Sequence, residues 1–81
     1  MFYKIIDVEA LENYILLITF ENGNEKYYDI KPLFKKWKIF NKLKENNLYK
    51  FLKVDCGGYG ISWNDEIDLS SNELWENGFN K

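Results

Sequence analysis

The sequence predicts a single α+β domain in which short helices pack on a mainly antiparallel sheet of about five strands, in the order β-β-β-α-β-β-α. Three observations lead to this class. Short apolar runs bounded by turn residues occur in both halves of the chain, a proline-led, lysine-rich segment separates them, and a helix-start signal stands near the end. Because 81 residues support one hydrophobic core, we expect one domain over residues 1–81.

The first three strands are predicted over residues 2–10, 14–20 and 25–30. Residues 2–10 are dense in side chains that favour strands. Residues 14–20 form a nearly continuous apolar run, which is typical of a central strand covered on both faces. Between the second and third strands, Asn22-Gly23 accepts the positive φ angles of a type I′ turn, so we expect an antiparallel hairpin.

Short helices are predicted in the middle of the chain. Pro32 suits the first turn of a helix, because its missing N–H costs nothing there. A helix over residues 32–37 places its apolar side chains, including Trp37, on one side. Apolar residues then recur irregularly over residues 38–51, which indicates short helical turns instead of one long helix.

A second hairpin is predicted from residues 52–56 and 60–64, because Gly57-Gly58 between them tolerates a tight turn. Cys56 ends the first of these strands. A nucleophilic role would need a base or an orienting partner, and none is visible in the sequence. We therefore expect Cys56 to be a small buried strand residue.

The last helix has the clearest local signal. Ser70 and Glu73 have the spacing of a capping box, in which each side chain bonds the other residue's main-chain N–H. Leu69 and Leu74 stand where a hydrophobic staple closes over such a box. Gly78 supplies the expected helix stop.

The residues that carry chemistry argue against an enzyme. The chain has no histidine, which removes Ser-His-Asp and Cys-His sites and the usual zinc ligand. Asp65, Glu66 and Asp68 are the remaining candidates for a cation site or an acid–base pair. Their spacing matches no calcium loop, and acids before a helix also complement its dipole. We expect a structural role for them, with no catalytic residue, metal or cofactor.

Charge is distributed unevenly, although the net charge is only −2. Residues 31–53 contain eight lysines against one acid, Glu45, for a balance of +7. Lysines interleaved with aromatic residues are used by nucleic-acid binders for phosphate contacts and base stacking. However, the chain has no arginine for bidentate contacts, so a solvated lysine face over buried rings is the favoured interpretation.

Two observations indicate a cytoplasmic protein. Cys56 is the only cysteine, so no intramolecular disulfide can form, which fits a reducing compartment. The amino terminus lacks a signal-peptide core, because Asp7 interrupts it. The longest apolar run, residues 14–20, is also far shorter than the roughly 20 residues of a membrane span, so we expect no membrane partner.

The order and spacing of several short motifs resemble the bacterial family called domain of unknown function 2442. These motifs are Tyr14–Phe20, Asn22-Gly23, Tyr28–Leu33, Gly60–Trp63, Ile67–Ser70 and Glu73–Trp75. The resemblance implies a small α+β fold and a bacterial source, with no agreed catalytic residues. Some relatives are encoded beside another small protein in toxin–antitoxin-like pairs, and others carry a carboxyl-terminal helix-turn-helix. The present sequence stops three residues after Gly78, so we expect no such domain in it.

The leading hypothesis is a non-enzymatic protein-binding module, antitoxin-like or regulatory, that docks on another small and toxin-like protein. Nucleic-acid binding through residues 31–53 is the alternative, and an enzyme is the least supported class. Sheet extension at an open edge strand is a route to a homodimer, which the sequence leaves open. The candidate partner-binding residues are Lys35, Lys36, Trp37, Lys38, Asp65 and Glu66.

Overall fold

The computed structural model describes residues 3–80 and confirms the α+β class with antiparallel pairing. Over these residues the chain forms two sheets instead of the single sheet that we expected. The larger sheet has the strand order β1-β2-β3-β7 and consists of β1 (Ile5–Ala10), β2 (Ile15–Phe20), β3 (Glu25–Asp29) and β7 (Phe79–Asn80). The smaller sheet has the order β4-β5-β6 and consists of β4 (Lys53–Val54), β5 (Gly60–Ser62) and β6 (Asp68–Ser70).

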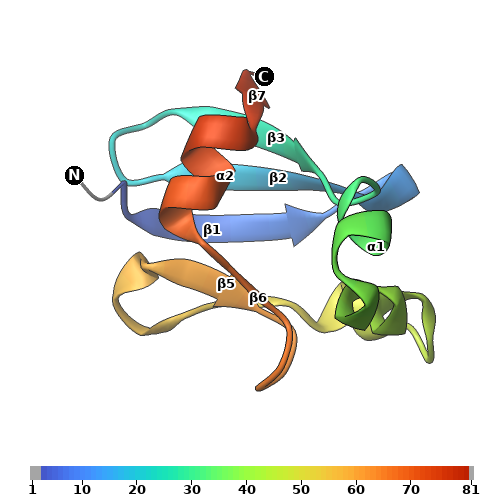
Figure 1. Cartoon of the computed structure of the whole chain (residues 1–81). Coiled ribbons are helices and arrows are strands. Elements are labelled where there is room, and N and C mark those ends of the chain that lie inside the picture. The colour runs from blue at the N-terminus through green and yellow to red at the C-terminus, as the bar shows by residue number, and fades with distance from the viewer. Residues whose placement is uncertain (1–2, 81) are drawn as a thin grey trace.

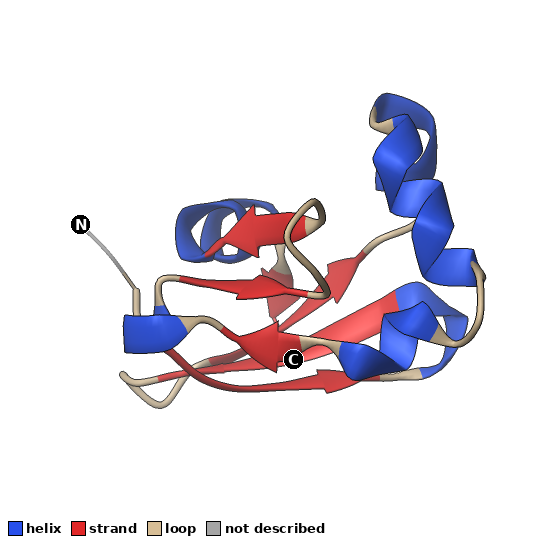
Figure 2. Cartoon of the chain, turned by 90° about the horizontal axis from the view of Figure 1, so that it is seen from below, coloured by secondary structure: helices blue, strands red, loops and turns tan. Residues whose placement is uncertain are grey.

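Short helices cover and connect these strands. The α-helices are α1 (Leu33–Lys36) and α2 (Ser71–Asn77), and the 3₁₀ helices are η1 (Glu12–Tyr14), η2 (Lys38–Lys44), η3 (Leu48–Phe51) and η4 (Cys56–Gly58). Figure 1 shows α2 lying across one face of β1, β2 and β3, with α1 at one end of that sheet and the smaller sheet alongside β1. Seen from below, the strands occupy the middle of the molecule and helical segments lie around them (Figure 2).

The central strand β2 carries much of the core. Leu16, Ile18 and Phe20 point to one face and are completely buried, because alternate residues of a strand face the same side. Phe20 meets the ring of Trp75 on α2 edge to face, with 5.0 Å between ring centroids. The residues between them are only half-buried. The position of β2 is thus confirmed, but its coverage on both faces is not complete.

The first hairpin is confirmed, but the prediction of a type I′ turn was wrong. The Phe20 N–H donates to the Asn24 carbonyl, and the Gly23 N–H donates to the Phe20 carbonyl. Gly23 has a φ of 93°, but Asn22 is not among the positive-φ residues that a type I′ turn requires. The loop is therefore the three-residue kind, which ends on a left-handed glycine. The first strand begins at Ile5, and the predicted position Phe2 lies outside the described residues.

The lysine-rich middle folds as short helical segments, as predicted. Pro32 stands at the N-cap of α1 with a φ of −61°, and η2 and η3 follow. Phe40 and Tyr49 are buried, whereas the lysines of this segment are exposed. Trp37 and Phe51 are 42% and 67% exposed, so the prediction of rings buried throughout this segment was wrong for these two residues.

The second hairpin pairs β4 with β5, but the residues between them differ from the prediction. Cys56 does not continue the strand. It lies exposed in η4, because the chain turns there through a φ of 81° at Gly57. The next residue, Gly58, has a φ of 78° and lies against the backbone of Ile5. The expectation of a buried strand cysteine was therefore wrong.

The helix α2 starts and stops at the predicted residues by partly different contacts. The Ser70 hydroxyl accepts from the Glu73 N–H at 3.1 Å, which is one half of the capping box. Leu69 and Leu74 are both buried, as the staple requires. Gly78 stands at the C-cap with an ordinary φ of −77°. Its lack of a side chain matters because a Cβ there would collide with the Leu74 carbonyl.

Candidate functional site

A depression of about 370 Å³ is lined by residues of η2, β6 and α2 and of the segments just before η2 and β6. We call it the Trp37 groove. The apolar side chains of its lining belong mainly to η2 or to the residue just before it. Three carboxylates, which we call the acidic wall, come from the loop before β6, from β6 and from α2. The lining residues are Trp37, Ile39, Phe40, Glu66, Asp68, Leu69, Ser70 and Glu73.

Trp37 stands at the rim because of the backbone break between α1 and η2. It is extended (φ −132°, ψ 111°), and its N–H closes α1 by donating to the Leu33 carbonyl at 2.9 Å. Its ring packs against the ring of Phe40, with 5.8 Å between the two ring centroids. The Lys36 ammonium lies 4.7 Å from its ring centroid. These contacts hold a large aromatic side chain that is still 42% exposed.

Asn64 sets the position of the acidic wall at one end. Its side-chain oxygen accepts from the N–H groups of Glu66 and Ile67, at 2.8 and 2.9 Å, which is a turn that asparagine forms well. The Glu66 carboxylate lies 3.9 Å from the Lys42 ammonium, and both side chains are more than half exposed. An exposed pair of this length contributes under about 1 kcal/mol, so Glu66 remains available to another cation.

Glu73 defines the other end of the acidic wall. Its carboxylate accepts from the Tyr28 hydroxyl at 2.8 Å. Burial, followed by the bond to Glu73, raises the pKa of the Tyr28 hydroxyl above its usual value of about 10. Tyr28 therefore keeps its proton over the physiological range, and Glu73 is held as a hydrogen-bond acceptor at the groove.

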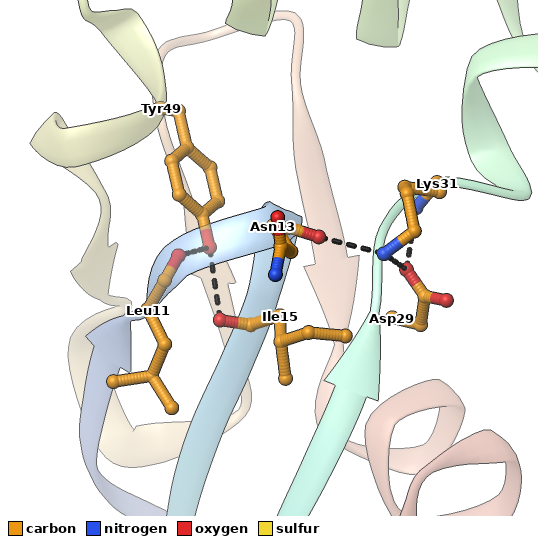
Figure 3. A network of polar contacts seen from close by, with 6 residues as sticks. All are labelled: Leu11, Asn13, Ile15, Asp29, Lys31 and Tyr49. Atoms are coloured by element: carbon orange, nitrogen blue, oxygen red, sulfur yellow. Dashed lines mark hydrogen bonds and ion pairs between the residues drawn. The ribbon is translucent and has the colours of Figure 1, made fainter.

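A second feature is the strained connection between β1 and β2, drawn in Figure 3. Asn13 and Tyr14 have φ values of 61° and 59°, a conformation that a bulky residue rarely adopts. The Tyr49 hydroxyl lies 2.7 Å from the Leu11 carbonyl and 2.9 Å from the Ile15 carbonyl, on the two sides of the connection. One hydroxyl hydrogen thus serves both carbonyls. Strain of this kind costs about 1–3 kcal/mol and persists where neighbours enforce it.

Lysines surround this connection, but two of them already have partners within the chain. The Lys31 ammonium contacts the Asn13 carbonyl at 2.7 Å and the Asp29 carboxylate at 3.0 Å (Figure 3). The Lys44 ammonium lies 4.4 Å from the ring centroid of Phe34. Asp29 therefore reduces the net positive charge near Tyr14, and both Lys31 and Lys44 already contact other residues of the chain.

Alkaline pH is expected to destabilise the protein through its buried tyrosines. Burial is the main reason that the pKa of Tyr49 is raised to about 12. The unfolded chain releases this proton near pH 10 whereas the folded chain keeps it, so the free energy of unfolding falls from about pH 10 to 12. Denaturant titrations across this range should show the fall. Tyr49→Phe should make it shallower, and an unchanged slope would contradict this account.

The family comparison matches residues 5–80 to the family described as Protein of unknown function (DUF2442). The chain belongs to this family. The match includes every strand from β1 to β7, so the Trp37 groove lies inside the DUF2442 region. It confirms the resemblance read from the sequence motifs, while the bacterial source stays a prediction. No curated protein and no solved structure matches the chain significantly.

The structure of this DUF2442 member brings some of the predicted partner-binding residues together. Trp37 and Glu66 line the same groove, and Lys36 lies over the Trp37 ring. Lys35 lines a different depression, next to Tyr14. Lys38 and Asp65 are exposed and stand next in sequence to Trp37 and Glu66, respectively.

Sequence reasoning named Glu66 and Asp68 as acids that could carry chemistry, but it did not predict that Asp68, Ser70 and Glu73 line the Trp37 groove. Asp68 and Ser70 reach the groove because β6 pairs with β5. This strand was not predicted because three residues with a single apolar side chain show no detectable alternation. Glu73 was assigned wholly to the capping box. Its contact with Tyr28 spans 45 residues and therefore has no local signal.

Two further findings on the DUF2442 chain concern metals and membranes. Within residues 3–80, histidine, cysteine, aspartate and glutamate form no group of three or more that could hold a metal ion. The carboxylates of residues 65–68 thus do not converge on one point. No helix in the described part of the chain is both long enough and apolar enough to span a bilayer.

Proposed function

We propose that this protein is a non-enzymatic protein-binding module that docks a partner through the Trp37 groove. The observation that carries the proposal is the exposed ring of Trp37 at the rim of a groove lined by carboxylates. Tryptophan is among the residues that most often dominate binding energy at protein interfaces, because its large ring is desolvated when a partner covers it.

The acids of the groove suit docking better than proton transfer. Glu66 and Asp68 are exposed, and Glu73 accepts from Tyr28. Exposed charges of one sign steer an oppositely charged partner and raise the rate of association. Such a module would act by holding another small protein, in an antitoxin-like or regulatory role.

A binding comparison between Trp37→Ala and Phe51→Ala tests the proposal. The wild-type protein and both variants would be used to copurify partners from the cells that supply the gene, and the affinity for a captured protein would then be measured by calorimetry. We expect Trp37→Ala to weaken that affinity at least about tenfold, the loss typical of a central interface residue. Phe51 is also an exposed ring in the lysine-rich segment but lies outside the groove, so its variant should bind normally.

Two results would count against docking at the groove. One is a partner that binds the wild type and Trp37→Ala equally well. The other is a partner that both ring variants lose to the same extent, because that would point to the lysine-rich segment in general. Circular dichroism of both variants shows whether a loss of binding reflects a loss of fold.

Nucleic-acid binding through residues 31–53 is the second candidate function. A depression lined by Tyr14, Phe34, Lys35 and Lys44 supports it, because aromatic rings and lysines can contact bases and phosphates. Fluorescence anisotropy with a single-stranded oligonucleotide at two salt concentrations tests it. Affinity that falls steeply with salt and is reduced in Lys35→Glu supports this function, whereas absent or salt-independent binding rejects it.

A further inference from the structure

The strand β6 lies at the open edge of the smaller sheet, whose order is β4-β5-β6. Two bonds fix which of its main-chain groups face β5. The Trp63 N–H donates to the Ile67 carbonyl at 3.0 Å. The Ser71 N–H donates to the Tyr59 carbonyl at 2.9 Å. Because bonded pairs alternate along an antiparallel ladder, Leu69 is the β6 residue whose main chain also faces β5.

The main-chain groups of Asp68 and Ser70 therefore point to the outer side of β6. The Ser70 carbonyl stands at the N-cap of α2, where it accepts the first bond of the helix. For the Ser70 N–H and for both main-chain groups of Asp68, the structure of residues 3–80 contains no hydrogen-bond partner. A complete capping box would occupy the Ser70 N–H with Glu73, but that carboxylate binds Tyr28 instead. Three outward-facing groups of β6 are therefore unpaired within residues 3–80.

This free edge opens into the Trp37 groove. All three residues of β6 line the groove, and the apolar residues Trp37, Ile39 and Phe40 line it as well. An extended segment laid along β6 would thus have main-chain bonds on one edge and an apolar wall nearby. Addition of a strand to an exposed sheet edge is a recurrent mode of peptide recognition, in which the main chain gives affinity and alternate side chains give specificity.

The charges of the groove indicate what such a segment carries. Glu66, Asp68 and Glu73 contribute three carboxylates to the lining. Lys42 approaches Glu66 at 3.9 Å, and within residues 3–80 neither Asp68 nor Glu73 forms an ion pair. A segment with lysine or arginine at alternate positions would pair with them, and an apolar residue between would cover Trp37.

We propose that an extended, basic segment of the partner protein adds as a strand to the outer edge of β6, within the Trp37 groove. This inference rests on the proposed function and names the chemistry of the partner. It commits to a different protein as the occupant. The free edge of a second copy would bring the same three acids together, and the lysine-rich segment of a second copy is mostly folded into short helices, so it is not an extended strand.

Synthetic peptides test the inference on the wild-type protein. The probe is a short peptide of alternating lysine and valine, and its controls are the glutamate–valine peptide and a lysine–valine peptide N-methylated at alternate residues. N-methylation blocks main-chain bonds while it keeps the side chains. In a ¹⁵N NMR titration, we expect the lysine peptide to shift the Asp68 and Ser70 amides but not the distant Gly23 amide. Both controls should bind at least about tenfold more weakly.

A matched pair of variants at Ser70 tests the same edge from the side of the protein. Ser70→Ala removes the capping hydroxyl but keeps the main-chain N–H. Ser70→Pro removes both, and the native φ of −77° is compatible with proline. Because both variants lack the hydroxyl, the alanine variant is the reference, and we expect the proline variant to bind the lysine peptide at least about tenfold more weakly than the alanine variant does. Circular dichroism verifies that both are folded.

The outcomes separate this inference from the proposed function. Suppose that Trp37→Ala abolishes partner binding, whereas neither Ser70→Pro nor N-methylation of the peptide changes the affinity. The groove then docks a partner without strand addition, and only the inference is overturned. The inference is also overturned if the lysine and glutamate peptides bind equally well, or if neither peptide binds. A wild-type dimer that Ser70→Pro dissociates, seen by gel filtration, assigns the edge to a second copy and overturns the commitment to a different protein.

Discussion

Gly58→Ala is expected to destabilise the protein by about 3 kcal/mol or more, a large fraction of the total stability of a small domain, which is about 5–15 kcal/mol. Gly58 has a φ of 78°, which costs a residue with a side chain about 1–2 kcal/mol. An added Cβ would also lie 2.5 Å from the Ile5 carbonyl oxygen and 3.1 Å from the Ile5 nitrogen. Because those atoms belong to the backbone of β1, they cannot move aside without disturbing the larger sheet.

Gly23→Ala is the matched control for this substitution. Gly23 also has a left-handed φ, 93°, but an added Cβ there meets nothing within 4 Å. Its expected cost is therefore the conformational term alone, about 1–2 kcal/mol. Urea titrations of the two variants measure the difference directly. Equal destabilisation would show that close packing of η4 against β1 does not contribute.

Phe20→Ala is expected to cost about 3–5 kcal/mol, in the range measured when a buried aromatic residue is truncated. The Phe20 side chain is fully buried and ends β2 beneath α2, where its ring meets Trp75. Its loss leaves a cavity between the sheet and the helix. Since α2 also carries Glu73, the same variant should disturb the acidic wall of the Trp37 groove.

Phe51→Ala is the control for the loss of a phenyl ring in itself. Phe51 is 67% exposed, so its truncation removes little buried surface and should change stability by less than about 1 kcal/mol. Thermal unfolding followed by circular dichroism compares the two variants. A similar fall in melting temperature for both would contradict the placement of Phe20 in the core.

Local signals were sufficient where the chain interacts with its near neighbours. The hairpin around Gly23, the helix after Pro32 and the helix start at Ser70 each depend on residues within a few positions, and each was predicted at nearly the right place. The type of turn at Gly23 was not, because the sequence Asn-Gly fits both a two-residue loop and the longer loop that ends on glycine.

The candidate site depends on contacts that are distant in sequence, which explains why only part of it was predicted. Trp37 looked like a core residue by spacing, but a backbone break after α1 turns its ring toward the rim. Glu73 meets Tyr28 across 45 residues. The edge strand β6 was missed because its single apolar residue, Leu69, gives no alternation to detect.

The Tyr49 hydroxyl has a consequence for the order in which the chain folds. It reaches carbonyl groups 38 and 34 residues earlier in the sequence, at Leu11 and Ile15. Contacts of such separation form only after a long loop has closed, and that closure is slow and entropically costly. During synthesis, the connection between the first two strands must therefore wait for residue 49 to emerge from the ribosome before it can be locked into its native shape.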